Sequence, residues 1–283
     1  MIVRGKVVYG KQLARTMGFP TANILYCSDM SGIYSGLLDS RKAILYIHDN
    51  VLEAHVLDWS GDLYDKEVEV HIGQKLRDHR VFECLDQIIT QIKQDVFIYR
   101  IVSSIMDSVA AHDRVCVAFS GGKESCILVD LLTRCQIQFD VVHFKPIQST
   151  NTETEFFDTF LQNHGKTYTT IEYEENQFQS AVETLNTKYT VCFLGVRSSD
   201  TGKDTYESTW LSKCIVVVPL FHISYSQVWY IIDYFQIQVS KKYSEGYSSV
   251  GYGSVPNKFL KKFDGSGYVH AKYLGNTTKE RSR

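Results

Sequence analysis

Val115-Cys-Val-Ala-Phe-Ser-Gly-Gly-Lys-Glu-Ser125 is an apolar stretch that meets two glycines and then leads into a second apolar stretch ending near Thr133. We interpret it as a buried strand, a glycine turn and a helix. The first N–H groups of such a helix lack partners within it. Together with the helix dipole and Lys123, these N–H groups favour the binding of a phosphate or pyrophosphate. A glycine has no side chain, so the anion can come close to the backbone. The alternative is an ordinary strand-to-helix turn without a ligand.

The spacing of this loop excludes one common nucleotide motif and matches another. It lacks the G-x-x-x-x-G-K-[ST] pattern of a Walker A loop. It resembles the S-G-G-K-[DE]-S pyrophosphate loop (PP-loop) of the ATP-pyrophosphatase superfamily, the adenine nucleotide α-hydrolase-like proteins. Those enzymes cleave ATP between its α and β phosphates. The resemblance implies that ATP is bound by Ser120, Gly121, Gly122, Lys123, Glu124 and Ser125.

Length and composition limit the possible functions. The 283 residues suffice for two domains, and 44% hydrophobic with 22% charged residues is typical of a globular chain. A net charge of −2 gives no basic excess, so we expect small-molecule substrates and no nucleic acid. Seven cysteines without a C-x-x-C pair predict reduced thiols. With no long apolar run and no room for a leader before Ile2, we expect a cytoplasmic enzyme without a membrane segment. The oligomeric state stays open.

The first part of the chain alternates between apolar and polar residues and turns often. Evenly spaced short strands of this kind predict a small antiparallel β-barrel. We expect a helix from about Cys84 to Asp95 and a second helix from about Val96 to Ala111 that links the two halves. The predicted strands are Lys6–Tyr9, Ile33–Leu37, Lys42–Ile47, Leu52–Leu57 and Glu67–Ile72.

From Arg114 onward strands and helices alternate, which predicts an α/β doubly wound parallel sheet. A ligand of such a sheet binds at the carboxyl ends of the strands, where the Ser-Gly-Gly loop lies. We therefore predict a barrel domain at 1–97 and an α/β domain at 98–283. The predicted strands are 115–119, 139–144, 168–172, 190–195 and 214–218, and the predicted helices are 124–134, 153–164, 176–186 and 225–235.

The first half has its own candidate site. Thr21 and Asn23 stand one residue apart after a proline, so on an extended segment their oxygens point to one side. A hydroxyl and an amide oxygen suit Mg²⁺ that carries nucleotide phosphates. Gly10 and Lys11 lie in a loop that can cover those phosphates, and Glu53 is a candidate general base. The alternative for Glu53 is a solvent-facing strand residue.

In order, Gly18-Phe-Pro-Thr-Ala-Asn23, Gly32-Ile-Tyr-Ser-Gly36 and Glu53-Ala-His55 resemble riboflavin kinase. The resemblance implies that Thr21 and Asn23 bind Mg²⁺–ATP and that Glu53 accepts the proton of the riboflavin 5′-hydroxyl. It also implies that a flavin-closing segment contains Leu76, Arg77 and Phe82.

One departure from that family stands next to Glu53. The segment between Gly36 and Glu53 is short, and Ile47-His-Asp-Asn50 replaces the family's I-G-x-x-P turn. If the shortening displaces Glu53 from Thr21 and Asn23, the first half is a degenerate kinase.

The second half narrows the choice within the superfamily. No cysteine follows Cys214, which disfavours a phosphoadenylyl-sulfate reductase, and the paired cysteines of RNA-thiolating enzymes are missing. The motifs Gly195-Val-Arg-Ser-Ser-Asp200 and Gly246-Tyr-Ser-Ser-Val-Gly251, with a terminal Glu-Arg and a further arginine, resemble the eukaryotic-type FAD synthases (FMN adenylyltransferases). By that resemblance the flavin or its phosphate is bound by Arg197, Asp200, Tyr247, Arg281 and Arg283.

The two resemblances together imply a bifunctional flavin-biosynthesis enzyme. The first half would make FMN from riboflavin, and the second would make FAD and pyrophosphate from FMN and ATP. The alternative is a single-function FAD synthase with a non-catalytic, flavin-binding kinase half. A third is an adenylating enzyme with a different acceptor.

Overall fold

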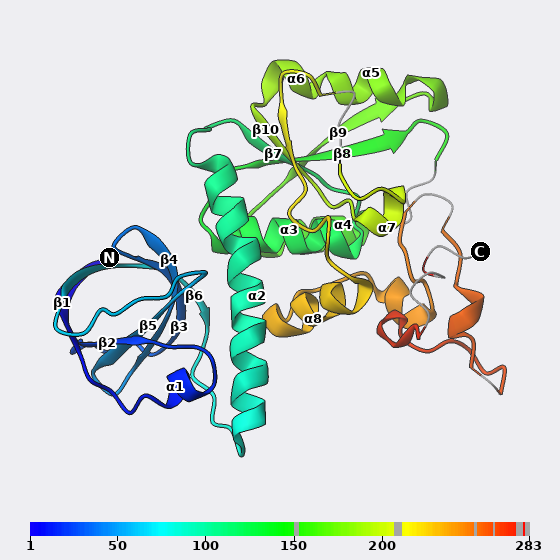
Figure 1. Cartoon of the computed structure of the whole chain (residues 1–283). Helices are drawn as coiled ribbons and strands as arrows, with labels where there is room; N and C mark the ends of the chain where they lie inside the picture. The colour runs from blue at the N-terminus through cyan, green and yellow to red at the C-terminus, as the bar shows by residue number, and fades with distance from the viewer. Residues whose placement is uncertain (150–152, 207–210, 252–253, 263, 276–279, 281–283) are drawn as a thin grey trace. The chain divides into compact units, whose positions relative to one another are not determined.

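The computed structural model describes residues 1–149, 153–206, 211–251, 254–262, 264–275 and 280. The chain divides into two compact units, Met1–Ser103 and Ser104–Arg283 (Figure 1). This division and the predicted boundary between residues 97 and 98 both fall within one helix, α2 (Leu85–Val109).

The first unit is a closed antiparallel barrel, as predicted. Its strand order is β1-β2-β5-β4-β3-β6. The short β2 was not among the predicted strands, and a four-residue helix, α1 (Leu13–Thr16), precedes it. The strands are β1 (Ile2–Val8), β2 (Ala22–Leu25), β3 (Gly32–Leu38), β4 (Arg41–His48), β5 (Val51–Val56) and β6 (Glu67–Arg77).

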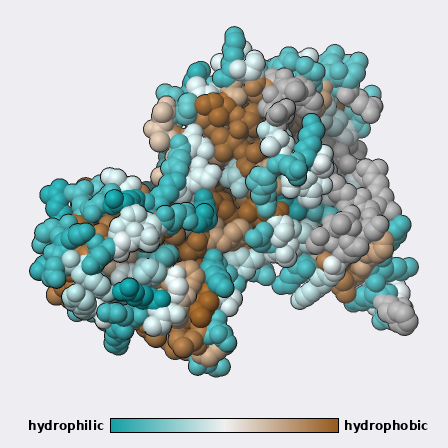
Figure 2. All heavy atoms as spheres, in the orientation of Figure 1, coloured by the Kyte–Doolittle hydropathy of each residue, from teal (hydrophilic) through white to brown (hydrophobic). Residues whose placement is uncertain are grey.

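Alternate residues of the strands fill the barrel. On β5, Leu52, Ala54 and Val56 are buried, while the residues between them are half-buried. This period of two gives each strand one face toward the core and one toward the outside. The visible surface of the first unit carries mainly hydrophilic residues (Figure 2). Polar side chains on the outer face are therefore free to form a site without disturbing the core.

A two-residue turn fixes the register of β4 and β5. Asp49 and Asn50 have φ angles of 44° and 62°, the left-handed region that the tightest hairpin turns require. The turn pairs His48 with Val51 and Tyr46 with Glu53. The shortened segment noted in the sequence is thus a tight hairpin, and Glu53 stays in the sheet.

The prediction of two helices between residues 84 and 111 was wrong. Helix α2 (Leu85–Val109) runs for 25 residues without interruption. No glycine or proline breaks the segment, and Asp95 does not end a helix, because its carboxylate is paired with Arg77. The hydroxyl of Tyr99 donates to the carbonyl of Gly36 at 2.8 Å, which ties α2 to the barrel.

The second unit is the predicted parallel α/β sheet, with strand order β11-β10-β7-β8-β9. All four neighbouring strand pairs are parallel. Helices α5 and α6 lie on one face of the sheet, and α3 and α4 on the other (Figure 1). The strands are β7 (Val115–Ala118), β8 (Asp140–Pro146), β9 (Tyr168–Tyr173), β10 (Val191–Leu194) and β11 (Ile215–Val217).

Most predicted helices of this unit are present, but the one expected at 176–186 is not continuous. It consists of a 3₁₀ turn at Glu175–Gln177, α5 (Phe178–Glu183) and α6 (Leu185–Lys188). At the junction the Thr184 hydroxyl donates to the carbonyl of Ala181 at 2.6 Å, a local bond that competes with helix continuation. The other helices are α3 (Lys123–Arg134), α4 (Thr154–Asn163), α7 (Ser198–Thr201) and α8 (Tyr225–Phe235).

The strand order reverses between β7 and β10. From β7 the chain continues to β8 and β9 on one side, and β10 and β11 are added on the other. In open α/β sheets, ligands usually bind at such a reversal, outside the carboxyl ends of the two strands. The Ser-Gly-Gly loop follows β7 there, and Arg197 follows β10.

A buried carboxylate links α3 to the end of α4. Asp130 on α3 is 6% exposed, and its carboxylate lies 2.5 Å from Arg134 Nε and 3.2 Å from His164 Nε2. Burial alone would lower the pKa of His164, but the hydrogen bonds to Asp130 and to the Phe160 carbonyl, with the charge of Asp130, together outweigh it and raise the pKa from its ordinary 6.5.

We expect His164→Gln to destabilise the protein more at acidic pH than at alkaline pH. With a raised folded-state pKa, the stabilisation is complete below pH 6.5 and is lost as pH rises through the folded-state value. The loss at pH 5.5 should be about 1 kcal/mol. Urea midpoints of the wild type and the variant between pH 5.5 and 8.5 test this, with the exposed His222→Gln as control. A difference that grows with pH would contradict it.

Candidate functional site

The predicted residues of the first half lie together on β2, β5 and the segment before β2. Asn23 and Glu53 are cross-strand partners, and the Thr21 hydroxyl donates to Glu53 Oε2 at 3.0 Å. Ala22 and Ile24 point into the barrel, so Thr21 and Asn23 share the outer face. The short hairpin therefore leaves Glu53 next to both residues.

Two cavities meet at Thr21, which lines both of them. One has a volume of about 450 Å³, and its walls include Arg15, Asn23 and Tyr64. The other has a volume of about 380 Å³, and its walls include Glu53. Apolar side chains form most of the second cavity, among them Leu13, Met17, Phe19, Ile33, Ile44, Val81, Phe82 and Ile88. A polar ligand and an apolar ligand could thus touch at Thr21, with Glu53 beside the contact.

The loop before α1 approaches Asn23 closely. A Cβ atom on Gly10 would stand 2.6 Å from Asn23 Oδ1, so a larger residue there would displace the Asn23 side chain. The Asn23 amide donates to the carbonyl of Thr21 at 3.4 Å, which leaves Oδ1 on the side of Gly10. Lys11 is exposed. The structure thus brings Gly10 to the site and leaves the Lys11 side chain in solvent.

The predicted flavin-closing residues differ in their surroundings. Phe82 and Arg77 line the apolar cavity, whereas Leu76 is 6% exposed. The Arg77 guanidinium makes a two-point ion pair with Asp95, with Nε at 2.8 Å from Oδ1 and Nη2 at 2.6 Å from Oδ2. Gln91 also donates to Asp95. Arg77 thus ties the end of β6 to α2 at the wall of the cavity.

Sequence reasoning missed three residues of this site. His48 Nε2 lies 3.0 Å from Glu53 Oε1, and its ring stacks on Tyr46 at 4.1 Å. The Tyr46 hydroxyl lies 2.5 Å from His79 Nδ1. The signal that could have found His48 and Tyr46 is the period of two around the hairpin, which places both on the face of Glu53.

In the second unit, the Ser-Gly-Gly loop has the geometry that its glycines permit. Gly121 has φ of +73°, and a Cβ atom there would stand 2.0 Å from a ring carbon of Phe157. The N–H of Gly122 donates to Ser120 Oγ at 3.2 Å. Ser125 Oγ lies 3.3 Å from Ser120 Oγ and donates to the carbonyl of Gly122. The loop therefore curls around its own serine hydroxyls.

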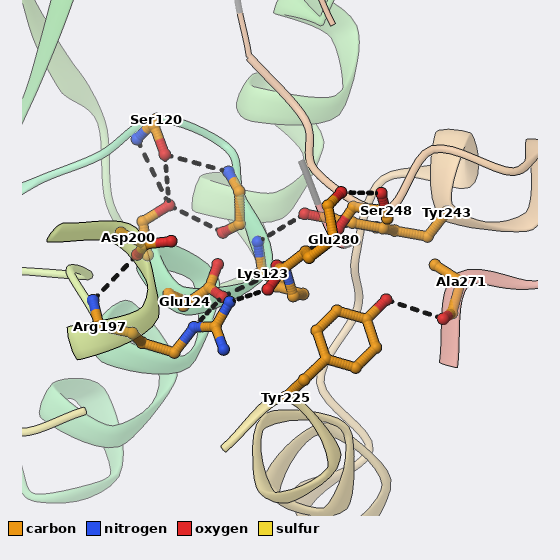
Figure 3. A network of polar contacts seen from close by, with 12 residues as sticks. Ser120, Lys123, Glu124, Arg197, Asp200, Tyr225, Tyr243, Ser248, Ala271 and Glu280 are labelled. Carbon is orange, nitrogen blue, oxygen red and sulfur yellow. Dashed lines mark hydrogen bonds and ion pairs between the residues drawn. The ribbon is translucent and has the colours of Figure 1, made fainter. Parts of the chain in front are cut away.

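Lys123 and Arg197 lie in a buried network of four charges (Figure 3). Each is 1% exposed. Lys123 Nζ lies 2.5 Å from Glu280 Oε1 and 3.2 Å from Glu124 Oε1. Arg197 Nε lies 2.9 Å from Glu124 Oε1, and Arg197 Nη2 contacts Glu280 Oε2. We call these four residues the charge quartet.

The charge quartet is electrically neutral. A buried ion is tolerated only when partners compensate its lost hydration. Burial alone would raise the pKa of Glu124, but Lys123 and Arg197 hold it below its ordinary value. Burial alone would lower the pKa of Arg197, but Glu124 and Glu280 raise it. The close pair of Arg197 Nε and Glu124 Oε1 lacks hydrogen-bond alignment, so charge rather than direction holds it.

Other groups fix the quartet in place. The main chain of Glu280 accepts hydrogen bonds from Ser248 and Asn257, and Lys123 Nζ donates to the Ser248 carbonyl at 3.1 Å. The backbone N–H of Lys123 donates to the Tyr243 hydroxyl at 2.9 Å. Tyr243 and Ser248 thus pack against the start of α3.

The structure does not bring Lys123 and Arg197 to a solvent-facing surface, because the quartet holds both side chains inside. Asp200 accepts from the backbone N–H of Arg197 at 2.9 Å and so caps α7. Tyr247 is half-buried, with Lys242 Nζ 5.6 Å from its ring centre. Arg281 and Arg283 lie outside the described residues. Sequence reasoning included Glu280 only as part of the terminal Glu-Arg motif and assigned it no role, whereas the structure makes it the acidic partner of both buried cations.

Comparison with known proteins agrees with this division of the chain. Residues 1–102 match the riboflavin kinase family. Residues 114–257, half of the chain, match the phosphoadenosine phosphosulfate reductase domain. The chain belongs to the phosphoadenosine phosphosulfate reductase domain family.

Curated relatives resemble this member of the reductase domain family over only part of their length. A bifunctional riboflavin kinase/FMN adenylyltransferase of Escherichia coli K12 is 34% identical over 110 residues, 33% of this chain and 35% of the relative. An RNA-binding riboflavin kinase of Bacillus subtilis is 30% identical over 112 residues, 34% of this chain and 48% of the relative. The chain thus spans about a third to a half of these relatives.

Among solved structures, FMN adenylyltransferase of Candida glabrata has a similar fold. Its complex with ATP has a TM-score of 0.58 and 16% identity, and the match covers 73% of this chain and 90% of that one. Its complex with FAD and pyrophosphate has a TM-score of 0.54 and 15% identity, with 73% and 91% covered. At these identities the likeness shows the fold alone.

Several predictions from composition bear on the chemistry of the sites. All seven cysteines are free thiols, and five of them are buried. Within the described ranges, no helix is long and apolar enough to cross a membrane. No group of three or more His, Cys, Asp and Glu side chains there is arranged to hold a metal ion by itself.

We expect Glu280→Gln to destabilise the second unit by roughly 3 kcal/mol, because it leaves the buried quartet with an uncompensated positive charge. Urea unfolding followed by circular dichroism measures the loss. The matched control is Glu172→Gln, whose pair with Lys145 at 2.9 Å is exposed and should contribute less than about 1 kcal/mol. Equal losses in the two variants would contradict the role of the quartet.

Proposed function

We propose that the chain makes FAD in two steps: the first unit phosphorylates riboflavin to FMN, and the second adenylylates FMN with ATP. The observation that carries this proposal is the meeting of two cavities at Thr21, with Glu53 in hydrogen-bond distance. The family matches and the names of the relatives support the same pair of reactions.

In the first step, ATP would occupy the cavity beside Arg15 and Asn23, and riboflavin the apolar cavity. Glu53 accepts the proton of the riboflavin 5′-hydroxyl. The 5′-oxygen attacks the γ-phosphorus of ATP, and ADP leaves. Thr21 stands at the border of the two cavities and orients Glu53 through its hydroxyl. Most of the catalysis in such a transfer comes from positioning.

Mg²⁺ is the ion that we propose for this step. The oxygens of Thr21 and Asn23 are hard ligands next to the proposed phosphate cavity, and Glu53 adds a carboxylate nearby. This set suits an ion that is held mainly by nucleotide phosphates and water. When bound, the ion neutralises phosphate charge.

In the second step, the phosphate of FMN attacks the α-phosphorus of ATP, and pyrophosphate leaves. The nucleophile is already an anion, so no protein base is required. Because the charge quartet occupies Lys123 and Arg197, we assign the pyrophosphate first to the backbone of the Ser120–Ser125 loop and its serine hydroxyls. Asp200, Tyr247, Arg281 and Arg283 remain the proposed flavin contacts, and Lys123 and Arg197 would hold the loop in shape.

The composition supports small-molecule substrates and a cytoplasmic location. A net charge of −2 provides no general attraction for nucleic acid. One relative is described as RNA-binding, so an RNA-binding measurement on this chain tests that part of the proposal.

The first test is to incubate the purified chain with riboflavin, ATP and Mg²⁺ and to separate riboflavin, FMN and FAD over time. We expect FMN first and FAD later. FAD from supplied FMN, without product from riboflavin, would identify a single-function FAD synthase. FMN without FAD would refute the proposed role of the Ser120–Ser125 loop.

The variant Glu53→Gln should separate the two activities. Loss of a general base lowers kcat for riboflavin phosphorylation by about 10²–10⁴-fold. FAD formation from supplied FMN should be unchanged, which serves as the control for the second unit, and circular dichroism checks that the barrel is folded. Unchanged phosphorylation would exclude Glu53 as the base, and equal losses of both activities would indicate misfolding.

A further inference from the structure

Two side chains hold the carboxylate of Glu53, one at each oxygen. The Thr21 hydroxyl donates to Oε2 at 3.0 Å, and His48 Nε2 lies 3.0 Å from Oε1. The side chains of Glu53 and His48 are 24% and 25% exposed, so both are largely shielded from water. Contacts at both oxygens restrict rotation of the carboxylate, which leaves one orientation for a third partner.

The tight hairpin brings His48 to this carboxylate. With Asp49 and Asn50 as the two turn residues, His48 pairs with Val51 and Tyr46 pairs with Glu53. The period of two then places His48 and Glu53 on the same face as diagonal neighbours. The shortened connection, which first suggested a degenerate kinase, is therefore what supplies the imidazole.

Neighbouring groups fix the orientation of the His48 ring. It stacks on Tyr46, with ring centres 4.1 Å apart and planes 22° apart. Its Nδ1 lies 3.4 Å from an oxygen of Asp49. Tyr46 is itself held by the contact of its hydroxyl with His79. Tyr46 and His79 both line the apolar cavity. This arrangement is typical of an activated site: one residue orients the base, and further groups hold that residue in place.

We propose that His48 is a positioning residue for phosphoryl transfer, which directs the free lone pair of Glu53 toward the substrate hydroxyl. This inference rests on the proposed function. In the step, the hydroxyl proton passes to Glu53, the new bond forms between the substrate oxygen and the γ-phosphorus, and ADP leaves with the electrons of the broken bond. His48 neither gains nor loses a proton.

The test compares His48→Leu with His48→Gln. The leucine variant should lower kcat for FMN formation by about tenfold or more, with both KM values within about twofold, because the hydrogen bond acts on the reacting group. The glutamine variant keeps an N–H donor near the place of Nε2 and should recover most of the rate. A rise in KM with unchanged kcat would overturn the proposal. So would a glutamine variant that is as slow as the leucine variant.

A matched control uses another histidine–glutamate pair of the barrel. His71 Nε2 lies 2.7 Å from Glu69 Oε1, and His71 is not among the residues that line the two cavities. His71→Leu should leave kcat unchanged. A comparable loss in His71→Leu would show that removing any such pair slows the enzyme through the fold.

A double-mutant cycle decides whether His48 acts through Glu53. In the Glu53→Gln background, adding His48→Leu should cost less than about twofold, because the interaction is already lost. An undiminished cost would overturn the proposal.

The imidazole NMR resonances of His48 should also shift in Glu53→Gln, and unchanged resonances would refute the contact. Wild-type protein that forms no FMN would overturn the proposed function and the catalytic role of His48, while the resonances still decide whether the contact exists.

Discussion

Neutralisation of buried charge is the constraint on which the second unit depends. Lys123 and Glu124 begin α3, Arg197 follows β10, and Glu280 lies near the C-terminus, yet their side chains form one closed set. None of these ions could be buried alone, because the loss of hydration would exceed any single attraction. The shape of the loop after β7 therefore depends on a residue more than 150 positions away. The geometry of that loop is thus a property of the whole unit.

In the first unit, backbone register has the corresponding role. The left-handed turn at Asp49 and Asn50 sets the pairing of β4 with β5, and the pairing of β5 with β2 then places Glu53 opposite Asn23. One change in the length of that turn would alter which side chains share the face of Glu53. The chemistry proposed for Glu53 thus depends on hairpin geometry as much as on the identity of the residue.

The patterns that were predicted correctly are local ones. A period of two showed the barrel strands, and the Ser-Gly-Gly sequence showed the strand, turn and helix around Gly121. The errors came where contacts outside the local pattern determined where a helix ends or breaks. Asp95 resembled the end of a helix, but it pairs with Arg77 inside a longer one. The helix expected at 176–186 is interrupted near Thr184, whose hydroxyl bonds to the backbone.

The sequence by itself determined the two-part organisation, most of the strands and helices, and the common face of Thr21 and Asn23, because these follow from periodicity and from residues close in the chain. Only the tertiary structure decided the partners of those residues. His48 reaches Glu53 through a register that the turn selects, and Glu280 neutralises Lys123 and Arg197 across 157 and 83 positions. Long-range pairing of charges leaves no local pattern, since its energy depends on distance in space and on burial.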